Sequence, residues 1–182
     1  GDRPVVWVGA RGEPRLDFGA PCPDGLARRG LEPARLARVE ARDARDALWA
    51  MEEALKAGAL VLGCVGAAGA YDLTASKRLH GAAARAGSCL FAVRAHDRAE
   101  ASAALTRWRV APVSSPPAPW TGAGGLPGLG APRWRAVLER ARGAPPEDHV
   151  IEWSDETFRS PQPAPMADRP ARARRAVRRA AG

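Results

Sequence analysis

The sequence predicts an α/β protein in which a mainly parallel sheet is flanked by helices and extended by antiparallel strands toward the C-terminus. Three observations lead to this fold class. Short apolar runs alternate with helical patterns over the first half of the chain, as in parallel strands joined by helices. One run, "ALVLGCV" at 59–65, is apolar throughout, which is typical of a parallel strand covered on both faces. Beyond residue 104, apolar and polar residues alternate without convincing helices between the runs, which indicates antiparallel strands.

The first three elements are short. "PVVWVG" at 4–9 is rich in β-branched and aromatic residues and predicts a strand. "DGLARRG" at 24–30 predicts a short helix that ends at Gly30. "ARLARVEA" at 34–41 is a weaker strand pattern.

The clearest helical pattern covers 44–57. Asp43 and Asp46 are alternative N-caps, and Gly58 supplies the C-terminal stop. Five residues fall at helical spacing on one apolar face: Ala44, Ala47, Leu48, Met51 and Leu55.

The strand at 59–65 follows at once. A second helix is expected at 75–86, capped by Asp72 or Thr74. "SCLFAVR" at 88–94 predicts the fourth strand.

Three later segments predict the antiparallel extension of the same sheet. Two of them, 104–112 and 149–155, alternate as strands with one wet face, whereas 133–142 also fits a short helix. The domain organisation expected is an α/β core at 1–112, a loop rich in Pro and Gly at 113–132, and C-terminal strands of the same domain at 133–160. The remainder, 161–182, is a basic tail whose composition indicates disorder.

The formal net charge of +8 is unevenly distributed. Residues 169–182 contain six Arg and no acid, so that they carry most of the excess, while residues 1–168 are close to neutral. A basic segment of this kind fits a binding role with nucleic acid phosphates or with an acidic partner.

The three cysteines are odd in number and widely spaced. Cys64 and Cys89 lie in apolar runs, which predicts reduced, buried thiols in a cytoplasmic protein. No apolar run reaches the length of a membrane span and no signal peptide is visible, so no membrane association is expected.

No catalytic, cofactor-binding or metal-binding residues are predicted. "TGAGGLPGLG" at 121–130 contains no Lys and lies between antiparallel strand patterns, so it is interpreted as a loop rather than a phosphate loop. His80, His96 and His149 are far apart and lack Cys or carboxylate neighbours at ligand spacing.

Two groups of residues are candidates for contact with a partner or with DNA. Trp108 in "TRWRV" and Trp134 in "PRWRA" are each flanked by Arg, an arrangement that can stack a base or clamp a phosphate. The alternative, which the pattern favours, is an amphipathic strand with Trp inward and Arg outward. The candidate residues are Arg107, Trp108, Arg109, and in the tail Arg169, Arg172, Arg174, Arg175, Arg178 and Arg179.

Four sequence pieces, "ALWAMEEAL", "DLTASKRL", "TRWRVA" and "PRWR…IEW", resemble the ImuA family, RecA-like accessory proteins of bacterial SOS mutagenesis. The resemblance covers about residues 4–155 and implies a RecA-like core whose phosphate-loop strand is missing from this chain and would lie upstream of Gly1. The acids expected of an active RecA core are absent around Gly9 and Ala10 and around 63–66.

The resemblance implies a non-catalytic adaptor in damage-induced translesion DNA synthesis, located in the cytoplasm at the nucleoid. Its implied partners are RecA and the polymerase-like protein ImuB, and through ImuB an error-prone DNA polymerase and the sliding clamp. Self-association is left open. The alternatives are a single-stranded DNA-binding protein, a RecA-like ATPase with its phosphate loop upstream, and, more remotely, a cell-division inhibitor of the same fold class.

Overall fold

A computed structural model describes residues 3–11, 21–66, 70–94, 101–117, 128, 130–143 and 145–153. The chain divides into two compact units, each made of two stretches of sequence. Unit 1 comprises Gly1–Arg109 and Leu138–Pro146, and unit 2 comprises Val110–Val137 and Glu147–Gly182.

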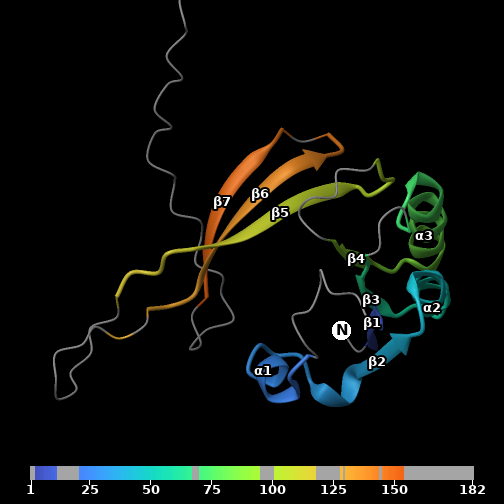
Figure 1. Ribbon diagram of the computed structural model, residues 1–182, viewed down its shortest axis with the longest axis horizontal. Coiled ribbons are helices and arrows are strands. Elements are labelled where there is room, and N and C mark those ends of the chain that lie inside the picture. The colour runs from blue at the N-terminus through green and yellow to red at the C-terminus, as the bar shows by residue number, and fades with distance from the viewer. Residues whose placement is uncertain are drawn as a thin grey trace, which may run out of the picture. The chain divides into compact units, whose positions relative to one another are not determined.

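Unit 1 is built on a four-stranded parallel sheet with the order β2-β1-β3-β4 (Figure 1). Its strands are β1 (Val5–Ala10), β2 (Leu36–Ala41), β3 (Leu60–Cys64) and β4 (Leu90–Val93). This confirms the mainly parallel sheet expected from the alternating apolar runs.

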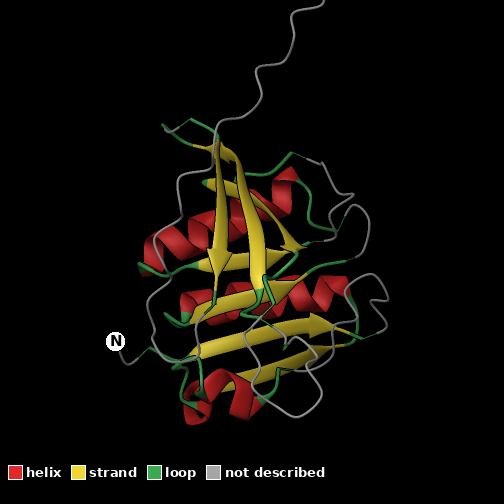
Figure 2. Cartoon of the chain, turned by 90° about the vertical axis from the view of Figure 1, so that its left-hand side faces the viewer, coloured by secondary structure: helices red, strands yellow, loops and turns green. Residues whose placement is uncertain are grey.

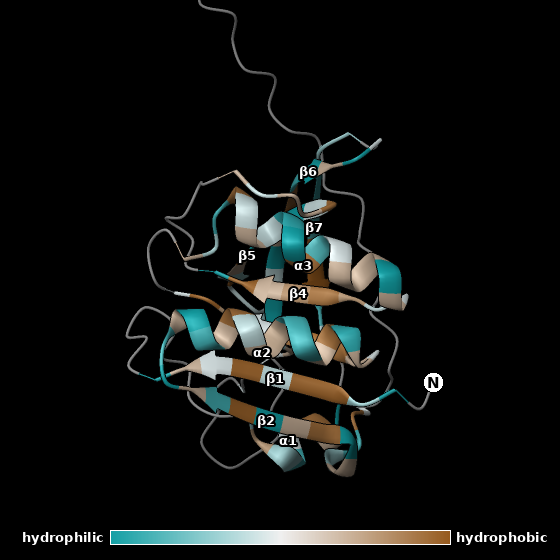
Figure 3. Cartoon of the chain, turned by 90° about the vertical axis from the view of Figure 1, so that its right-hand side faces the viewer, coloured by the Kyte–Doolittle hydropathy of each residue, from teal (hydrophilic) through white to brown (hydrophobic). Residues whose placement is uncertain are grey.

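Two helices cover one face of this sheet. α2 (Ala44–Lys56) and α3 (Leu73–Ala86) pack against each other and against the strands. Figure 3 shows both helices in front of the parallel strands, and Figure 2, from the opposite side, shows them behind. The apolar face of α2 supplies much of the core, because Ala47, Leu48, Met51 and Leu55 are all buried.

Local sequence signals explain where the helices begin and end. Of the two candidate caps for each helix, Asp43 caps α2 and Asp72 caps α3. α3 ends at Gly87, whose left-handed backbone (φ +57°) favours glycine. Two short helices, α1 (Pro23–Ala27) and the 3₁₀ helix η2 (Pro33–Arg35), precede β2.

The three C-terminal strands form a sheet of their own with the order β5-β6-β7. β5 (Thr106–Val113), β6 (Arg133–Ala141) and β7 (Glu147–Glu152) are antiparallel, because the amide of Trp153 bonds to Pro132 O and that of Arg142 to Leu105 O. The segment that also fitted a helix is therefore a strand.

The expected extension of one continuous sheet is wrong for the described residues. β4 is the last strand of the parallel sheet, and β5–β7 pair only with one another. Alternating polarity identifies a strand with one wet face, but it carries no information about which strand will be its neighbour.

The cysteine prediction holds for Cys64 but not for Cys89. Neither of these two cysteines forms a disulfide, and Cys64 is buried in β3. Cys89 is exposed because it precedes β4 instead of lying within it. Among the described residues, none of the helices combines the length and apolarity needed to cross a bilayer.

Candidate partner-binding surface

The carboxyl ends of β1 and β3 lie side by side, with Gly9 in register with Cys64. This is the edge of a parallel sheet at which ligands of open α/β proteins are usually bound. The residues here are Gly9 and Ala10 on β1, and Cys64, Val65 and Gly66 at the end of β3. None of these side chains can hold a metal ion through oxygen or position a water molecule as a carboxylate does.

The two aspartates near this edge are engaged as helix caps. Asp43 Oδ1 accepts a hydrogen bond from the amide of Asp46 at 2.9 Å, and Asp72 Oδ1 accepts one from Ala75 at 2.7 Å. These bonds satisfy amides that the first turn of a helix leaves without partners. Over the part of the chain that the structure describes, no group of three or more His, Cys, Asp or Glu residues is arranged to hold a metal ion.

Arginines surround the one tyrosine of the chain. Tyr71 is 5% exposed, and the Arg94 guanidinium lies 5.2 Å from its ring centroid. Burial raises the pKa of the Tyr71 phenol, while the positive charges of Arg94 and Arg107 act in the opposite direction. The pKa is raised on balance, so the phenol ionises only at a higher pH than a free tyrosine does.

The candidate DNA-contact residues of β5 are arranged differently from the expectation. Arg107 is half-buried, and its Nη2 lies 3.5 Å from Ser102 Oγ. Arg109 is exposed but paired with Glu139, with Nη2–Oε1 at 2.5 Å. Trp108 is 47% exposed, so the interpretation that places its side chain inward is wrong.

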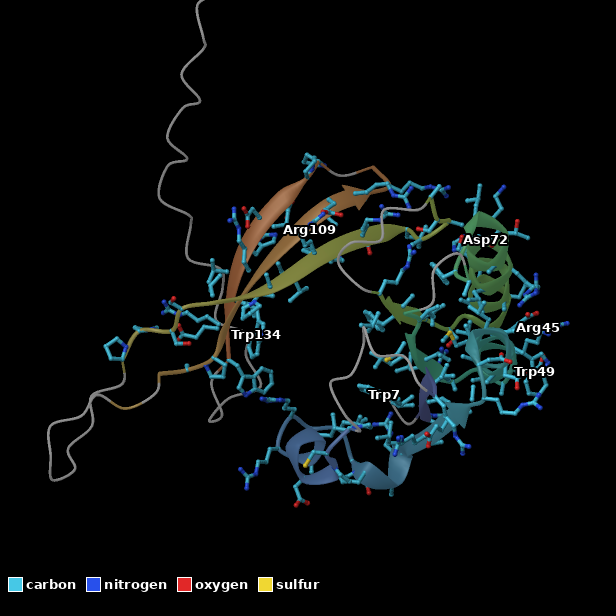
Figure 4. All side chains as sticks on the ribbon, in the orientation of Figure 1. Trp7, Arg45, Trp49, Asp72, Arg109 and Trp134 are labelled. Atoms are coloured by element: carbon cyan, nitrogen blue, oxygen red, sulfur yellow. The ribbon has the colours of Figure 1, made fainter. Side chains whose placement is uncertain are left out.

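Two further findings concern the other candidates. Trp134 is partly buried on β6, where Figure 4 labels it. The six tail arginines, Arg169, Arg172, Arg174, Arg175, Arg178 and Arg179, lie outside the described residues.

β2 forms one edge of the parallel sheet. Ala41 O accepts the amide of Arg11, so the backbone of residue 41 faces β1. Since successive residues of a strand direct their backbone groups to alternate sides, Arg38 and Glu40 direct theirs to the free edge. Four consecutive residues of β2, Ala37 to Glu40, are exposed, and none of the described strands pairs with this edge, so that it can accept another strand.

A hollow of about 320 Å³ lies beside this edge, between β2 and α2. This β2–α2 hollow is lined by Val39, Glu40, Ala41, Arg42, Asp46, Trp49 and Ala50. Trp49 is 63% exposed and Val39 is 36% exposed. Two apolar side chains at an open hollow are a feature of surfaces that bind other molecules.

The charges around the hollow are largely paired. Arg42 Nε lies 2.7 Å from Asp46 Oδ2, and the hydrogen bond between them raises the pKa of the Arg42 guanidinium. Glu40 is shared by Arg11 at 3.4 Å and Arg38 at 3.8 Å. Arg45 is exposed, and no acidic side chain of the described residues pairs with it.

Comparison with known proteins finds relatives of one kind. The chain is 37% identical over 171 residues to Protein ImuA of Caulobacter vibrioides strain NA1000 / CB15N, and equally to that of strain ATCC 19089 / CIP 103742 / CB 15. The match covers 87% of this chain. The chain is therefore similar to ImuA over most of its own length. The ImuA-like chain spans 64% of the length of the curated relatives it matches, and no family model matches it.

Sequence reasoning missed the β2–α2 hollow of this ImuA-like chain. The signal was present, because Trp49 falls on the polar side of the 44–57 helix, outside the apolar stripe. A tryptophan in that position is left exposed unless another element covers it. The other half of the hollow could not be found in this way, since the pairing of β2 with β1 depends on contacts between distant residues.

Proposed function

We propose that this ImuA-like protein is a non-catalytic adaptor in damage-induced translesion DNA synthesis, which binds RecA, ImuB or both. The likeness to ImuA connects the chain with DNA damage and mutagenesis in bacteria. A RecA-like ancestry of the parallel sheet forms part of the proposal.

The observation that carries the proposal is the composition of the carboxyl edge of the parallel sheet. Hydrolysis of a nucleoside triphosphate needs a bound Mg²⁺ and an oriented water molecule. The paired ends of β1 and β3 carry Gly9, Ala10 and Cys64, and Asp43 and Asp72 are held by helix amides. Side chains of this kind support a binding role and do not favour phosphate chemistry.

The binding role is supported by the β2–α2 hollow and the free edge of β2. An open sheet edge beside exposed apolar residues is suited to the addition of a strand from another protein. α2, which carries one side of the hollow, is held in place because its Met51 and Leu55 are fully buried in the core.

The test combines partner capture with an ATPase assay of the protein. We expect the immobilised chain to retain purified RecA or ImuB, and to release no phosphate from ATP and Mg²⁺ above the rate of a buffer control. Hydrolysis that depends on Mg²⁺ and on this protein would favour the alternative of an active ATPase. Failure to retain either partner would contradict the adaptor role.

Single-stranded DNA binding is a second candidate because Trp108 is 47% exposed between two arginines. Bases stack on exposed aromatic rings and phosphates bind arginine, with an affinity that falls steeply with salt. If this function operates, Trp108→Ala weakens oligonucleotide binding by about tenfold, in line with the usual worth of base stacking. Trp49→Ala is the matched control, since it removes an exposed tryptophan elsewhere.

A further inference from the structure

Building on the proposed adaptor function, we propose what the β2–α2 hollow recognises. It takes an extended segment of a partner protein that places an apolar side chain between Trp49 and Val39 and an acidic side chain beside Arg45. Figure 4 shows Arg45 and Trp49 close together on the outward side of α2.

The apolar part of the recognition comes from Trp49 and Val39. Both are exposed, Trp49 at 63%, although α2 itself is firmly anchored by Leu48 and Met51 on its inner side. A large aromatic side chain on a fixed helix loses little conformational freedom when a partner covers it. Tryptophan is also among the residues that most often dominate the binding energy of protein interfaces.

The acidic residue expected in the bound segment follows from which charges on this surface are already paired. Asp46 neutralises Arg42, and Glu40 lies near both Arg11 and Arg38. Arg45 is four residues before Trp49 and therefore on the same side of the helix. It is the cation of this surface for which the described residues supply no acid, so that a carboxylate on the partner completes the charge balance.

The extended conformation follows from the edge of β2. The backbone groups of Arg38 and Glu40 face outward and can form a ladder with a strand laid along them. Val39 lies between them, and its side chain is on the same face of the sheet as that of Ala41, which belongs to the core under α2. A strand paired here brings alternate side chains to the hollow.

A protein segment fits this surface better than a nucleic acid does. The hollow is lined by two carboxylates, those of Glu40 and Asp46, which repel phosphates. Arg42 is the one cation among the residues that line the hollow, and it is paired with Asp46.

The experiment uses a random peptide library displayed on phage and panned against the immobilised chain. We expect enriched peptides to share an apolar residue with an acidic residue one to three positions away. Arg45→Glu should weaken the binding of a representative synthetic peptide by about tenfold. Panning on that variant should select peptides with a basic residue in place of the acidic one. Trp49→Ala should abolish enrichment.

Matched variants separate this site from other surfaces. Arg85→Glu changes an exposed arginine on α3, and Trp108→Ala removes an exposed tryptophan on β5, and both should leave the peptide affinity unchanged. Circular dichroism and thermal unfolding establish that each variant is folded, which is expected because the substituted side chains are exposed.

Several results would overturn the inference. These are no enrichment on the wild-type chain, a consensus without an acid, or a consensus that Arg45→Glu leaves unchanged. If the chain self-associates in sedimentation and Trp49→Ala abolishes this, the hollow binds a second copy of the chain instead. If the chain binds an oligonucleotide and Trp49→Ala abolishes that binding, the hollow binds DNA instead.

Parallel capture of intact RecA and ImuB distinguishes the two proposals. If the Arg45→Glu variant no longer binds the peptide but still retains RecA or ImuB, the adaptor function is supported and the hollow is not the surface that contacts that partner. A different outcome is that neither the wild-type chain nor any variant retains RecA or ImuB, although the peptides are enriched with an apolar and an acidic residue. In that case the adaptor function with these partners is wrong, and the inference about what the hollow binds is still supported.

Discussion

Gly63 of β3 lies directly against Met51 of α2. A Cβ built at Gly63 meets Met51 Sδ at 2.4 Å, while Met51 itself is completely buried. The close packing of α2 on the sheet therefore depends on the missing side chain. Position 63 falls in the stretch where the resemblance implies a metal-linked acid, and in this fold an acid at 63 would enter the core instead of the carboxyl edge.

Gly63→Asp is expected to lower the free energy of unfolding by about 3–5 kcal/mol, because it combines overpacking with an unpaired buried charge. Gly63→Ala, which overpacks without the charge, should cost about 1–3 kcal/mol. Urea unfolding of the two variants measures the difference. Equal stability of Gly63→Asp and wild type would show that Met51 yields and that the position is open to an acid.

Tyr71 provides a pH-dependent observable, since it is the one tyrosine of the chain. Its pKa is raised above 10.0 mainly by burial, so the folded state prefers the neutral phenol. The associated stability is complete below about pH 10 and is lost as the pH rises through the folded pKa. Tyrosinate absorbance should therefore develop at higher pH in the folded chain than in urea, and coincident titrations would contradict this.

At the scale of elements, polar contacts add to the hydrophobic packing of α2 on α3 and connect α3 with the segment before β5. Glu52 of α2 lies 2.6 Å from Arg78 of α3 and 3.0 Å from Lys56. On α3, Ser76 Oγ accepts the amide of Ala103 at 3.0 Å and donates to Leu73 O at 2.9 Å. The segment before β5 is thus bound to the first turn of α3.

Ser76→Ala should destabilise the protein by about 1–3 kcal/mol, because Ser76 is 1% exposed and its loss leaves the Ala103 amide without a partner. Thr74→Ala, at an exposed position of the same turn, is the matched control and should change little. Thermal unfolding compares the two. A similar small effect in both variants would mean that water replaces the Ser76 hydroxyl.

At the scale of the whole molecule, charge and core are separated along the sequence. The buried cluster is formed by residues between Val8 and Ala82, whereas the densest positive charge lies in 169–182. Ion pairs such as Arg135–Asp148 and Arg133–Glu152 balance the charge of the antiparallel strands. The densest positive charge is thus far along the sequence from the buried cluster of the described residues.

Deletion of 161–182 is expected to leave the unfolding temperature unchanged and to weaken capture of ImuB, RecA or single-stranded DNA. The physical reason is that the six arginines supply electrostatic attraction, which should make the lost component sensitive to salt. Pull-downs at low and moderate salt measure it. Capture that is equal with and without the tail would remove the tail arginines from the binding surface.

Much of the fold was predictable because its signals are local. The apolar stripe of α2, the capping aspartates and Gly58 and Gly87 define the two main helices within a few residues of sequence. Runs such as "ALVLGCV" identify the parallel strands in the same way. The candidate site was less predictable, since Trp108 proved exposed and Arg107 half-buried, the opposite of the simple alternation.

By itself the sequence determined the types of α2, α3 and the parallel strands, the absence of acids at 9–10 and 63–66, and the resemblance to ImuA, because each depends on residues close together in the chain. The tertiary structure alone decided that β5–β7 form a separate sheet and that β2 is an edge strand. It alone also placed Val39 beside Trp49. These outcomes arise from competition among long-range pairings and packing, whose free energies no local pattern contains.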